Sequence, residues 1–382
     1  MKKNVIGLLV AIGLILLAGP SDTRAQDFYK GKTIRFIVGF AAGGGFDTYS
    51  RMIARHIGKH IPGNPATIVD NMTGAGSLIA ANYIFNKAEP DGLTIGNFIG
   101  PLVLQDALGN KAAKFDGRKF GWLGVPTPDS GVCVLTKASN ISSVDEWFKA
   151  KQPVKLGGTA PGSTTDDVPK LIKAAIDLPI QMIEGYKGTS RIRVAAEAGE
   201  IDGGCWAWES IKPTWSKALE SGQVQPVLQT MQESHPELKH VPLAVKYAKT
   251  DEARELLKIV DGAYGVVARP YSVPPGMPKE RLAMLQKAFM ETTKDPELLA
   301  EAKKAKLEFK PVDGPTIAKT FAGFYTLKDS TKAKLKEIVL PGKQPAAKNV
   351  TVQLVLGLDA SVKSNHLPAR CKSVWTEDSR ND

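Results

Sequence analysis

The sequence contains little cysteine and little histidine, which limits the chemistry that it can support. Its three cysteines, Cys133, Cys205 and Cys371, are widely spaced and odd in number, so they indicate neither a disulfide framework nor a metal-ligand cluster. We expect isolated thiols, with a single bridge as the alternative in an oxidising compartment. The five histidines include one pair at helical spacing, His56 and His60. No glutamate lies between them in the HExxH pattern, so this pair is more typical of a solvated helix face than of a metal site.

Several catalytic and nucleotide-binding motifs are also missing. No G-x-S-x-G motif occurs, which argues against a serine hydrolase. The segment GGGFDT lacks the last glycine of a dinucleotide-binding turn and the Gly-Lys-Ser/Thr that ends a phosphate-binding loop. The net charge is +11, but no basic stripe alternates with aromatic residues. We therefore expect no enzyme activity, no cofactor, no metal site and no nucleic-acid partner.

The first 25 residues have the pattern of a secretory signal peptide. Lys2 and Lys3 precede an apolar run at 5–18, and small residues lead to Ala25. The run is too short to span a bilayer comfortably, and no cysteine follows it to carry a lipid. We predict cleavage near Ala25 and export to the periplasm. An uncleaved N-terminal anchor is the alternative.

Strand and helix patterns alternate along the rest of the chain. Strands are predicted at 33–40, 66–72, 93–99, 132–136, 154–159, 180–186 and 263–268, with further segments at 201–207 and 224–230. Helices are predicted at 48–61, 76–88, from about 143, and at 166–176, 189–199, 250–260, 279–294, 296–306 and 314–339. This alternation indicates parallel α/β sheets, and two such series favour two lobes. In such folds ligands bind beyond the carboxyl ends of the strands, so we expect a cleft between the lobes.

Two glycine-containing turns stand at predicted strand-to-helix junctions. Gly43-Gly44-Gly45 precedes a helix that Asp47 or Thr48 can cap. Backbone N–H groups at a helix start favour an anion, and glycine removes the side chains that would block its approach. The segment GGTAPGSTTDD at 157–167 repeats the arrangement with added hydroxyl groups. Two such turns can clamp one anionic ligand; plain tight turns before capped helices are the alternative.

Five segments together resemble the substrate-binding proteins of tripartite tricarboxylate transporters, also called the Bug family. The segments are KTIRFIVGFAAGGGFDTYSRMIARHI, VDNMTGAGSLIAANYIFNKAEPDGLTIGNF, GGTAPGSTTDD, IEGYKGTSRIRVAAEAGEIDGG and GVVARPYSVPPGMPKERLAML. The resemblance covers residues 27–340 in the same order and spacing. It implies a two-lobed type II periplasmic solute-binding fold of the α/β class, with the lobes joined by crossover strands. It also implies a non-catalytic role in delivering a small organic acid to integral-membrane permease subunits.

The predicted organisation follows from this reading. The expected parts are the signal peptide at 1–25, lobe 1 at 26–126, lobe 2 at 127–255, a return to lobe 1 with C-terminal helices at 256–340, and an irregular tail at 341–382. We expect a monomer. A ligand sensor for a signalling partner and an exported hydrolase are the alternative functions.

The resemblance places a ligand carboxylate between the two glycine-containing loops, held by backbone groups, hydroxyls and ordered water. The site residues that it implies are Phe40, Ala41, Ala42, Gly43, Gly44, Gly45, Asp47, Thr48, Asn71, Gly76, Ser77, Thr159, Ala160, Gly162, Ser163, Thr164, Thr165, Asp166, Tyr186, Lys187 and Gly188. Asp166 and Asp167 replace a His-Leu pair common in the family, so they either cap the helix or face an ammonium or amide group of the ligand. In the segment CWAWES, Trp206 and Trp208 either pack in the core or line the cleft, and we include Trp206 in the site.

Overall fold

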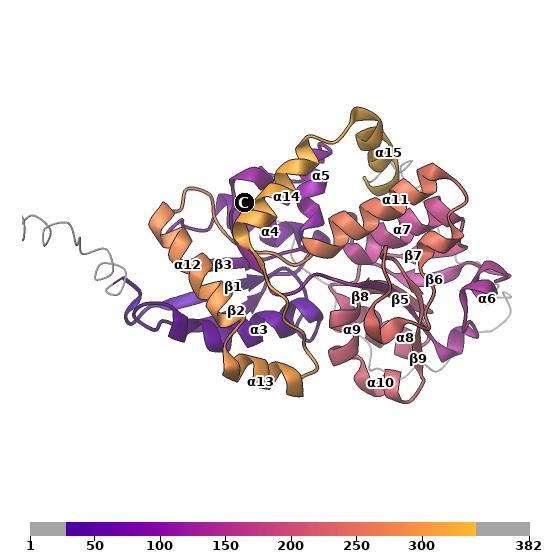
Figure 1. The fold of residues 1–382 in the computed structure, drawn as a ribbon, viewed down its shortest axis with the longest axis horizontal. Helices are drawn as coiled ribbons and strands as arrows, with labels where there is room; N and C mark the ends of the chain where they lie inside the picture. Colours follow the sequence, from indigo (N-terminus) through magenta and orange to yellow (C-terminus); the bar gives the residue numbers. More distant parts are fainter. Residues whose placement is uncertain (1–27, 341–382) are drawn as a thin grey trace, which may run out of the picture. The chain divides into compact units, whose positions relative to one another are not determined.

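The computed structural model describes residues 28–340, which form two lobes, each built on a mixed β-sheet with its own helices (Figure 1). The predicted signal peptide, the predicted tail and Cys371 lie outside the described residues. None of the helices that the structure describes has the length and apolar character needed to cross a bilayer.

The first lobe contains a six-stranded sheet in the order β11-β4-β10-β3-β1-β2. Its strands are β1 (Thr33–Val38), β2 (Ala66–Asn71), β3 (Thr94–Asn97), β4 (Gly121–Val125), β10 (Tyr271–Val273) and β11 (Val312–Asp313). The first three are parallel, while β10 and β11 run antiparallel to their neighbours. Its helices are α3 (Gly45–Ile57), α4 (Leu78–Asn86), α5 (Pro101–Ala107), α12 (Lys279–Thr292), α13 (Pro296–Lys304) and α14 (Gly314–Tyr325). Helices cover the parallel strands, as apolar strands such as β1 require.

The second lobe contains a five-stranded sheet in the order β7-β6-β8-β5-β9. Its strands are β5 (Gly131–Thr136), β6 (Val154–Gly157), β7 (Ile180–Ile183), β8 (Gly203–Ala207) and β9 (Val224–Gln229). The helices around it are α6 (Val144–Phe148), α7 (Thr164–Ile176), α8 (Thr189–Glu197), α9 (Trp208–Thr214), α10 (Ser216–Glu220), α11 (Asp251–Asp261) and α15 (Asp329–Val339). β6 is parallel to β7 and β8, whereas β5 is antiparallel to both β8 and β9.

Two crossover segments connect the lobes. The chain leaves the first sheet after β4, passes through 126–130 and enters β5; it returns through 267–270 to β10. The two segments lie side by side, since the N–H of Asp129 donates to the carbonyl of Gly265 just before the return segment, at 3.1 Å. Side chains of both crossover segments therefore lie where the two lobes meet.

A disulfide joins Cys133 on β5 to Cys205 on β8. The two residues are paired directly across antiparallel strands. The expectation of isolated thiols at these positions is therefore wrong, and the single bridge is the alternative that holds. The sequence could not show the pairing because 72 positions separate the two cysteines and only the sheet brings them together.

Two predicted elements differ from the structure. The segment 263–268 is not a strand, because residues Gly262–Val266 form a π-helical turn that continues α11. A short apolar run fits a buried helix as well as a strand, so its pattern cannot separate the two. The helix predicted over 314–339 is two helices, since α14 ends at Tyr325 and α15 begins at Asp329. This break lets α14 pack on β4 of the first lobe and α15 on α7 of the second.

Candidate functional site

A small cavity lies where both lobes and both crossover segments meet. Its volume is about 30 Å³, far below the ~300 Å³ at the lower end of small-molecule sites. The residues that line it are Phe40, Gly44, Gly45, Phe46, Ile99, Asp129, Thr159, Ser163, Thr164, Thr165, Thr189, Trp206, Ala207, Ser210 and Arg269. The first lobe, the second lobe and each crossover thus contribute to one cavity.

Three helices of eight residues or more begin at this cavity. They start at Gly45 in α3, Thr164 in α7 and Thr189 in α8. Among the described residues, no side chain caps any of the three, whereas Ser143 caps α6 and Thr250 caps α11 with a hydroxyl group. Uncapped starts leave backbone N–H groups and the positive ends of the helix dipoles available to an anion.

Asp47 and Asn71 lie beneath the first glycine turn and not in the cavity lining. The Asp47 carboxylate accepts the N–H of Gly43 at 2.9 Å and Nε of Arg51 at 2.9 Å. Asn71 donates to Asp47 at 2.9 Å and to the carbonyl of Phe40 at 2.8 Å. Burial acts to raise the pKa of Asp47, but the hydrogen bonds from Arg51, Gly43 and Asn71 outweigh it and lower the pKa. Asp47 therefore anchors the turn as an ionised group.

The second glycine-containing turn carries a cluster of hydroxyl groups. Thr159 donates to Ser163 at 2.6 Å and lies 3.2 Å from the hydroxyl of Thr165. Thr165 also accepts the backbone N–H of Thr159 at 3.1 Å. The hydroxyl of Thr164 is buried and has no partner among the described residues. This turn therefore contains one buried hydroxyl without a partner among the described residues, beside three hydroxyls that bind one another.

Asp166 and Asp167 are both buried, and neither lines the cavity. The Asp167 carboxylate accepts the N–H of Gly162 at 3.0 Å and the hydroxyl of Tyr264 at 2.7 Å. Asp166 pairs with Lys170 at 2.6 Å. Burial raises the pKa of Asp167 to about 7 and that of Asp166 to about 6. These contacts favour a role at the helix start over contact with a ligand.

Most of the other predicted site residues do not line the cavity. They are Ala41, Ala42, Gly43, Thr48, Gly76, Ser77, Ala160, Gly162, Tyr186, Lys187 and Gly188. Several of them bring the lobes together: Ala41 donates its N–H to the carbonyl of Lys187 at 2.9 Å. A Cβ added to Gly188, whose φ is +151°, would lie 3.1 Å from the Ala41 nitrogen. One added to Gly76 would lie 3.3 Å from the carbonyl oxygen of Ala160. These glycines allow a close approach of the two lobes.

Arg269 and Asp129, one from each crossover, form a buried ion pair that the sequence analysis missed. Arg269 is 1% exposed. Its Nε lies 2.7 Å and its Nη2 2.5 Å from Oδ1 of Asp129, and Nη2 also donates to Ser210 at 3.0 Å. The guanidinium lies 5.5 Å from the ring centre of Phe46 and 4.8 Å from that of Tyr49. The sequence feature that could have pointed to this ion pair is a lone arginine directly after the apolar run GVVA.

A second buried acid lies near this ion pair. Burial raises the pKa of Asp129 to about 7, although Arg269 acts to lower it, and the nearby carboxylate of Glu209 acts to raise it further. Glu209 itself is buried and accepts the N–H of Ser130 at 2.8 Å. One guanidinium therefore faces two buried acids.

Trp206 belongs to both the core and the cavity wall. Its ring stacks on Trp215 with the ring centres 5.7 Å apart, and it also lines the cavity. Its indole nitrogen is buried and has no partner in the described part of the chain. Both sequence interpretations of Trp206 therefore describe part of its environment, whereas Trp208 is buried outside the lining.

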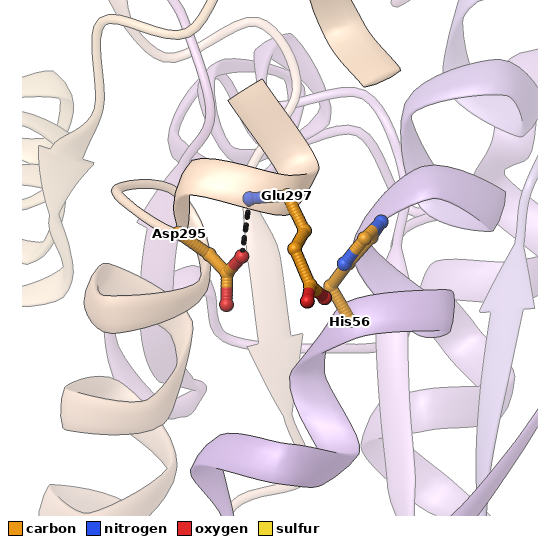
Figure 2. A group of neighbouring side chains, drawn as sticks. All are labelled: His56, Asp295 and Glu297. Carbon is orange, nitrogen blue, oxygen red and sulfur yellow. Dashed lines mark hydrogen bonds between the residues drawn. The ribbon is translucent and has the colours of Figure 1, made fainter. Parts of the chain in front are cut away.

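The pair His56 and His60 lies in an ion-pair network at the far end of α3. Of the described residues, His56, Asp295 and Glu297 bring ligand atoms within 4.8 Å of one another, and Figure 2 shows Glu297 extending from α13 toward His56. Lys59, however, binds both carboxylates, at 2.8 Å from Asp295 and 2.6 Å from Glu297. An ammonium group thus already neutralises the acids that a metal ion would need. We call these four residues, with His60, Arg55 and Glu301, the α3–α13 ion-pair cluster.

No family model matches the chain. Two curated proteins are similar to it in sequence. One, described as a UPF0065 protein in the TAR-I ttuE-ttuC' intergenic region of Agrobacterium vitis, is 30% identical over 210 residues, covering 54% of this chain and 58% of the relative. The other, a UPF0065 protein in the gbd 5' region of Cupriavidus necator, is 25% identical over 239 residues, covering 59% of this chain and 66% of the relative. The matches thus span less than two thirds of either relative.

Solved structures share the fold. The periplasmic binding protein BugD has a TM-score of 0.66 at 18% identity, covering 81% of this chain and 98% of its own. MatC from Rhodopseudomonas palustris with bound malate has a TM-score of 0.62 at 18% identity, covering 81% of this chain and 99% of its own. An R. palustris protein with adipate has a TM-score of 0.64 at 19% identity, covering 81% of this chain and 98% of its own. The predicted α/β periplasmic binding protein fold and the predicted resemblance to Bug proteins are confirmed. BugD is a periplasmic binding protein, which agrees with the prediction that the chain is not an enzyme.

Proposed function

We propose that this protein is a periplasmic solute-binding protein that captures a small organic carboxylate in the cavity between its lobes. The observation that carries the proposal is the convergence of three uncapped helix starts, from α3, α7 and α8, on that cavity. Backbone N–H groups from both lobes can then surround one anion. Malate and adipate, which two of the structural neighbours hold, are ligands of this chemical class.

Ligand entry requires the lobes to separate, because a cavity of about 30 Å³ is smaller than such a molecule. The two crossovers are the hinge in this proposal. The closed form is held by bonds such as that from Nη2 of Arg193 to the carbonyl of Gly43 at 3.0 Å.

The predicted lobe boundary at 255/256 falls inside α11, which packs on α7 of the second lobe. We therefore place the return to lobe 1 after residue 266.

The proposal also includes export of the protein to the periplasm and delivery of its ligand to a membrane transporter. The Cys133–Cys205 disulfide supports an oxidising compartment, as does the signal-peptide pattern at 1–25. The resemblance supports delivery by a monomer to permease subunits of a tripartite tricarboxylate-type transporter. A pull-down from the membrane fraction distinguishes this role from signalling: a transporter partner should be recovered with the ligand-loaded protein, and a sensor protein in its place would contradict transport.

A carboxylate panel tests the binding function. At a free ligand concentration of about a hundred times Kd, binding stabilises the folded state by about 2.7 kcal/mol, which raises the unfolding temperature measurably. We expect at least one of malate, succinate, glutarate and adipate to do so, and succinamide, which has no charge, to have no such effect. If no carboxylate changes the unfolding temperature or gives heat in calorimetry, the proposed function is wrong.

A further inference from the structure

Three buried hydrogen-bonding atoms that have no partner among the described residues belong to residues that line the cavity. They are Nη1 of Arg269, Nε1 of Trp206 and Oγ1 of Thr164. The three residues are 1%, 3% and 6% exposed. In the part of the chain that the structure describes, seven buried side-chain polar atoms have no partner, and three of these line this one cavity. A buried group without a partner destabilises the fold, so a cluster of them requires an explanation.

The neighbouring tryptophans show that the chain can pair an indole N–H where packing is the only role. Trp215, which stacks on Trp206, donates Nε1 to Glu197 at 2.6 Å. Trp208 donates Nε1 to Glu237 at 2.8 Å. Of these three tryptophans, the one that lines the cavity is the one with an unpaired N–H.

The guanidinium of Arg269 is fixed so that only one nitrogen is left over. Its Nε and Nη2 bind Asp129 and Ser210, and the rings of Phe46 and Tyr49 flank it. The remaining nitrogen, Nη1, has no hydrogen-bond partner among the described residues, so it is not bonded to Glu209. The orientation of Nη1 is therefore set before any ligand arrives.

The chemistry of the three groups matches a carboxylate. Two are N–H donors, one of them on a cation, and the third is a hydroxyl that can donate. A carboxylate offers two oxygens that each accept more than one hydrogen bond, and bonds to a guanidinium are charge-assisted. Because all three groups border a cavity of about 30 Å³, one small group can contact them together.

We infer that Arg269, Trp206 and Thr164 form one subsite that binds a carboxylate group of the ligand through these three atoms. The inference rests on the proposed function and adds three side-chain atoms to the backbone N–H groups at the helix starts. The first glycine turn also lets the lobes approach closely: a Cβ added to Gly45 would lie 1.9 Å from Oγ of Ser210. Thr164 and Trp206 belong to the second lobe and Arg269 to the returning crossover, so the subsite is built without a residue of the first lobe.

The test compares matched variants for affinity and for stability without ligand. Thr164→Val removes one unpaired hydroxyl at nearly constant shape. Trp206→Phe removes an unpaired N–H together with one ring, and its control Trp215→Phe makes the same change where the N–H is bonded within the protein. Affinity for the best binder among malate, succinate, glutarate and adipate is measured by calorimetry at neutral pH. We expect Trp206→Phe and Thr164→Val each to weaken binding by about tenfold or more, with an unfolding temperature that stays level or rises in Thr164→Val. Trp215→Phe should lower the unfolding temperature and change affinity by less than about twofold.

A double variant tests the charged member of the subsite without leaving Asp129 ionised and unpaired. Arg269→Gln combined with Asp129→Asn should weaken binding by about a hundredfold. A carboxylate that binds wild type and all these variants equally well overturns the subsite while leaving the proposed function standing. If none of the four carboxylates binds the wild-type protein, both the subsite and the proposed function are wrong. Loss of stability with unchanged affinity in Trp206→Phe and Thr164→Val would show that these residues are structural only.

Discussion

The cavity and the α3–α13 ion-pair cluster are both rich in charged and polar atoms, but the two regions use them differently. In the cluster, Asp295 binds Lys59 and His60 and also caps α13 through the backbone N–H groups of Glu297 and Leu298. Burial acts to raise the pKa of Asp295, but these hydrogen bonds lower it well below its usual range. In the cavity, Arg269 is more deeply buried than any of these residues, and one of its nitrogens is unpaired.

The difference separates structural polar groups from those that point to a ligand. A region whose charges are all matched, as around Asp295, gains stability from its contacts. A region that keeps donors unpaired in a buried place loses stability and can recover it only when a ligand binds. Histidines and acids attract attention in a sequence, yet the cavity, which has no histidine in its lining, is the stronger functional candidate.

The two regions should differ most in the free energy of unfolding that is lost when one ion pair is broken in each. Arg269→Ala leaves Asp129 without its partner beside Glu209, and we expect it to lower the free energy of unfolding by about 3–5 kcal/mol. Arg55→Ala removes a largely exposed partner of Glu301 and should cost about 0–1 kcal/mol. Urea denaturation of both variants measures this. Similar losses in the two would contradict the difference in burial between the regions.

Adding a methyl group at the cavity should affect binding more than folding. Gly45→Ala places a Cβ 1.9 Å from Oγ of Ser210 across the cleft. We expect closure to be impeded and carboxylate affinity to fall by about tenfold to a hundredfold. Gly323→Ala, at a position in α14 with no atom within 4 Å of the added carbon, is the control and should bind as wild type does. Unchanged affinity in Gly45→Ala would show that the lobes do not close in this way.

Removing the central acid of the α3–α13 ion-pair cluster should change stability alone. Asp295→Ala deletes the N-cap of α13 and the partner of Lys59 and His60, at a cost of about 1–2 kcal/mol. Carboxylate affinity measured by calorimetry should stay within about twofold of wild type. A large loss of affinity would mean that the cluster takes part in binding after all.

The smallest effect should be a pH dependence. The pKa of Asp129 and that of Asp167 are both raised to about 7 by burial, above their values in the unfolded chain. The folded state therefore holds protons that the unfolded state releases, so the stability that these two groups contribute is fully present below their unfolded pKa of about 4 and is lost as pH rises through about 7. We expect a loss of roughly 1 kcal/mol between about pH 6 and 8, reduced in Asp129→Asn. Rising stability over this range would contradict the direction of both shifts.

The sequence predicted the parts of the site that are local in the chain. The turns around Gly44 and Gly45 and around Thr159–Thr165 were found because glycine and hydroxyl residues cluster there between a strand and a helix. Most strands and helices were found for the same reason, since their patterns repeat over a few residues. The signal peptide, the tail and the proposed permease partner stay predictions.

Pairings between distant positions could not be predicted. Asp129 lies in TPDSG, which is typical of a turn, and Arg269 lies 140 positions further along the chain. Only the meeting of the two crossovers makes them a pair. The unpaired atoms of Trp206 and Thr164 were also invisible, because a sequence shows which groups can donate and not which have found a partner. The correction at Cys133 and Cys205 has the same cause.

The indole N–H resonance of Trp206 tests the central claim most directly. The sequence has six tryptophans, so the indole region of a ¹⁵N-labelled sample is simple, and Trp206→Phe assigns the signal. During titration with a carboxylate that binds, we predict that the Trp206 signal moves downfield and saturates together with binding, because the N–H gains an acceptor. The signals of Trp208 and Trp215, already bonded to Glu237 and Glu197, should stay in place. Saturable binding that leaves the Trp206 signal unmoved would contradict the account.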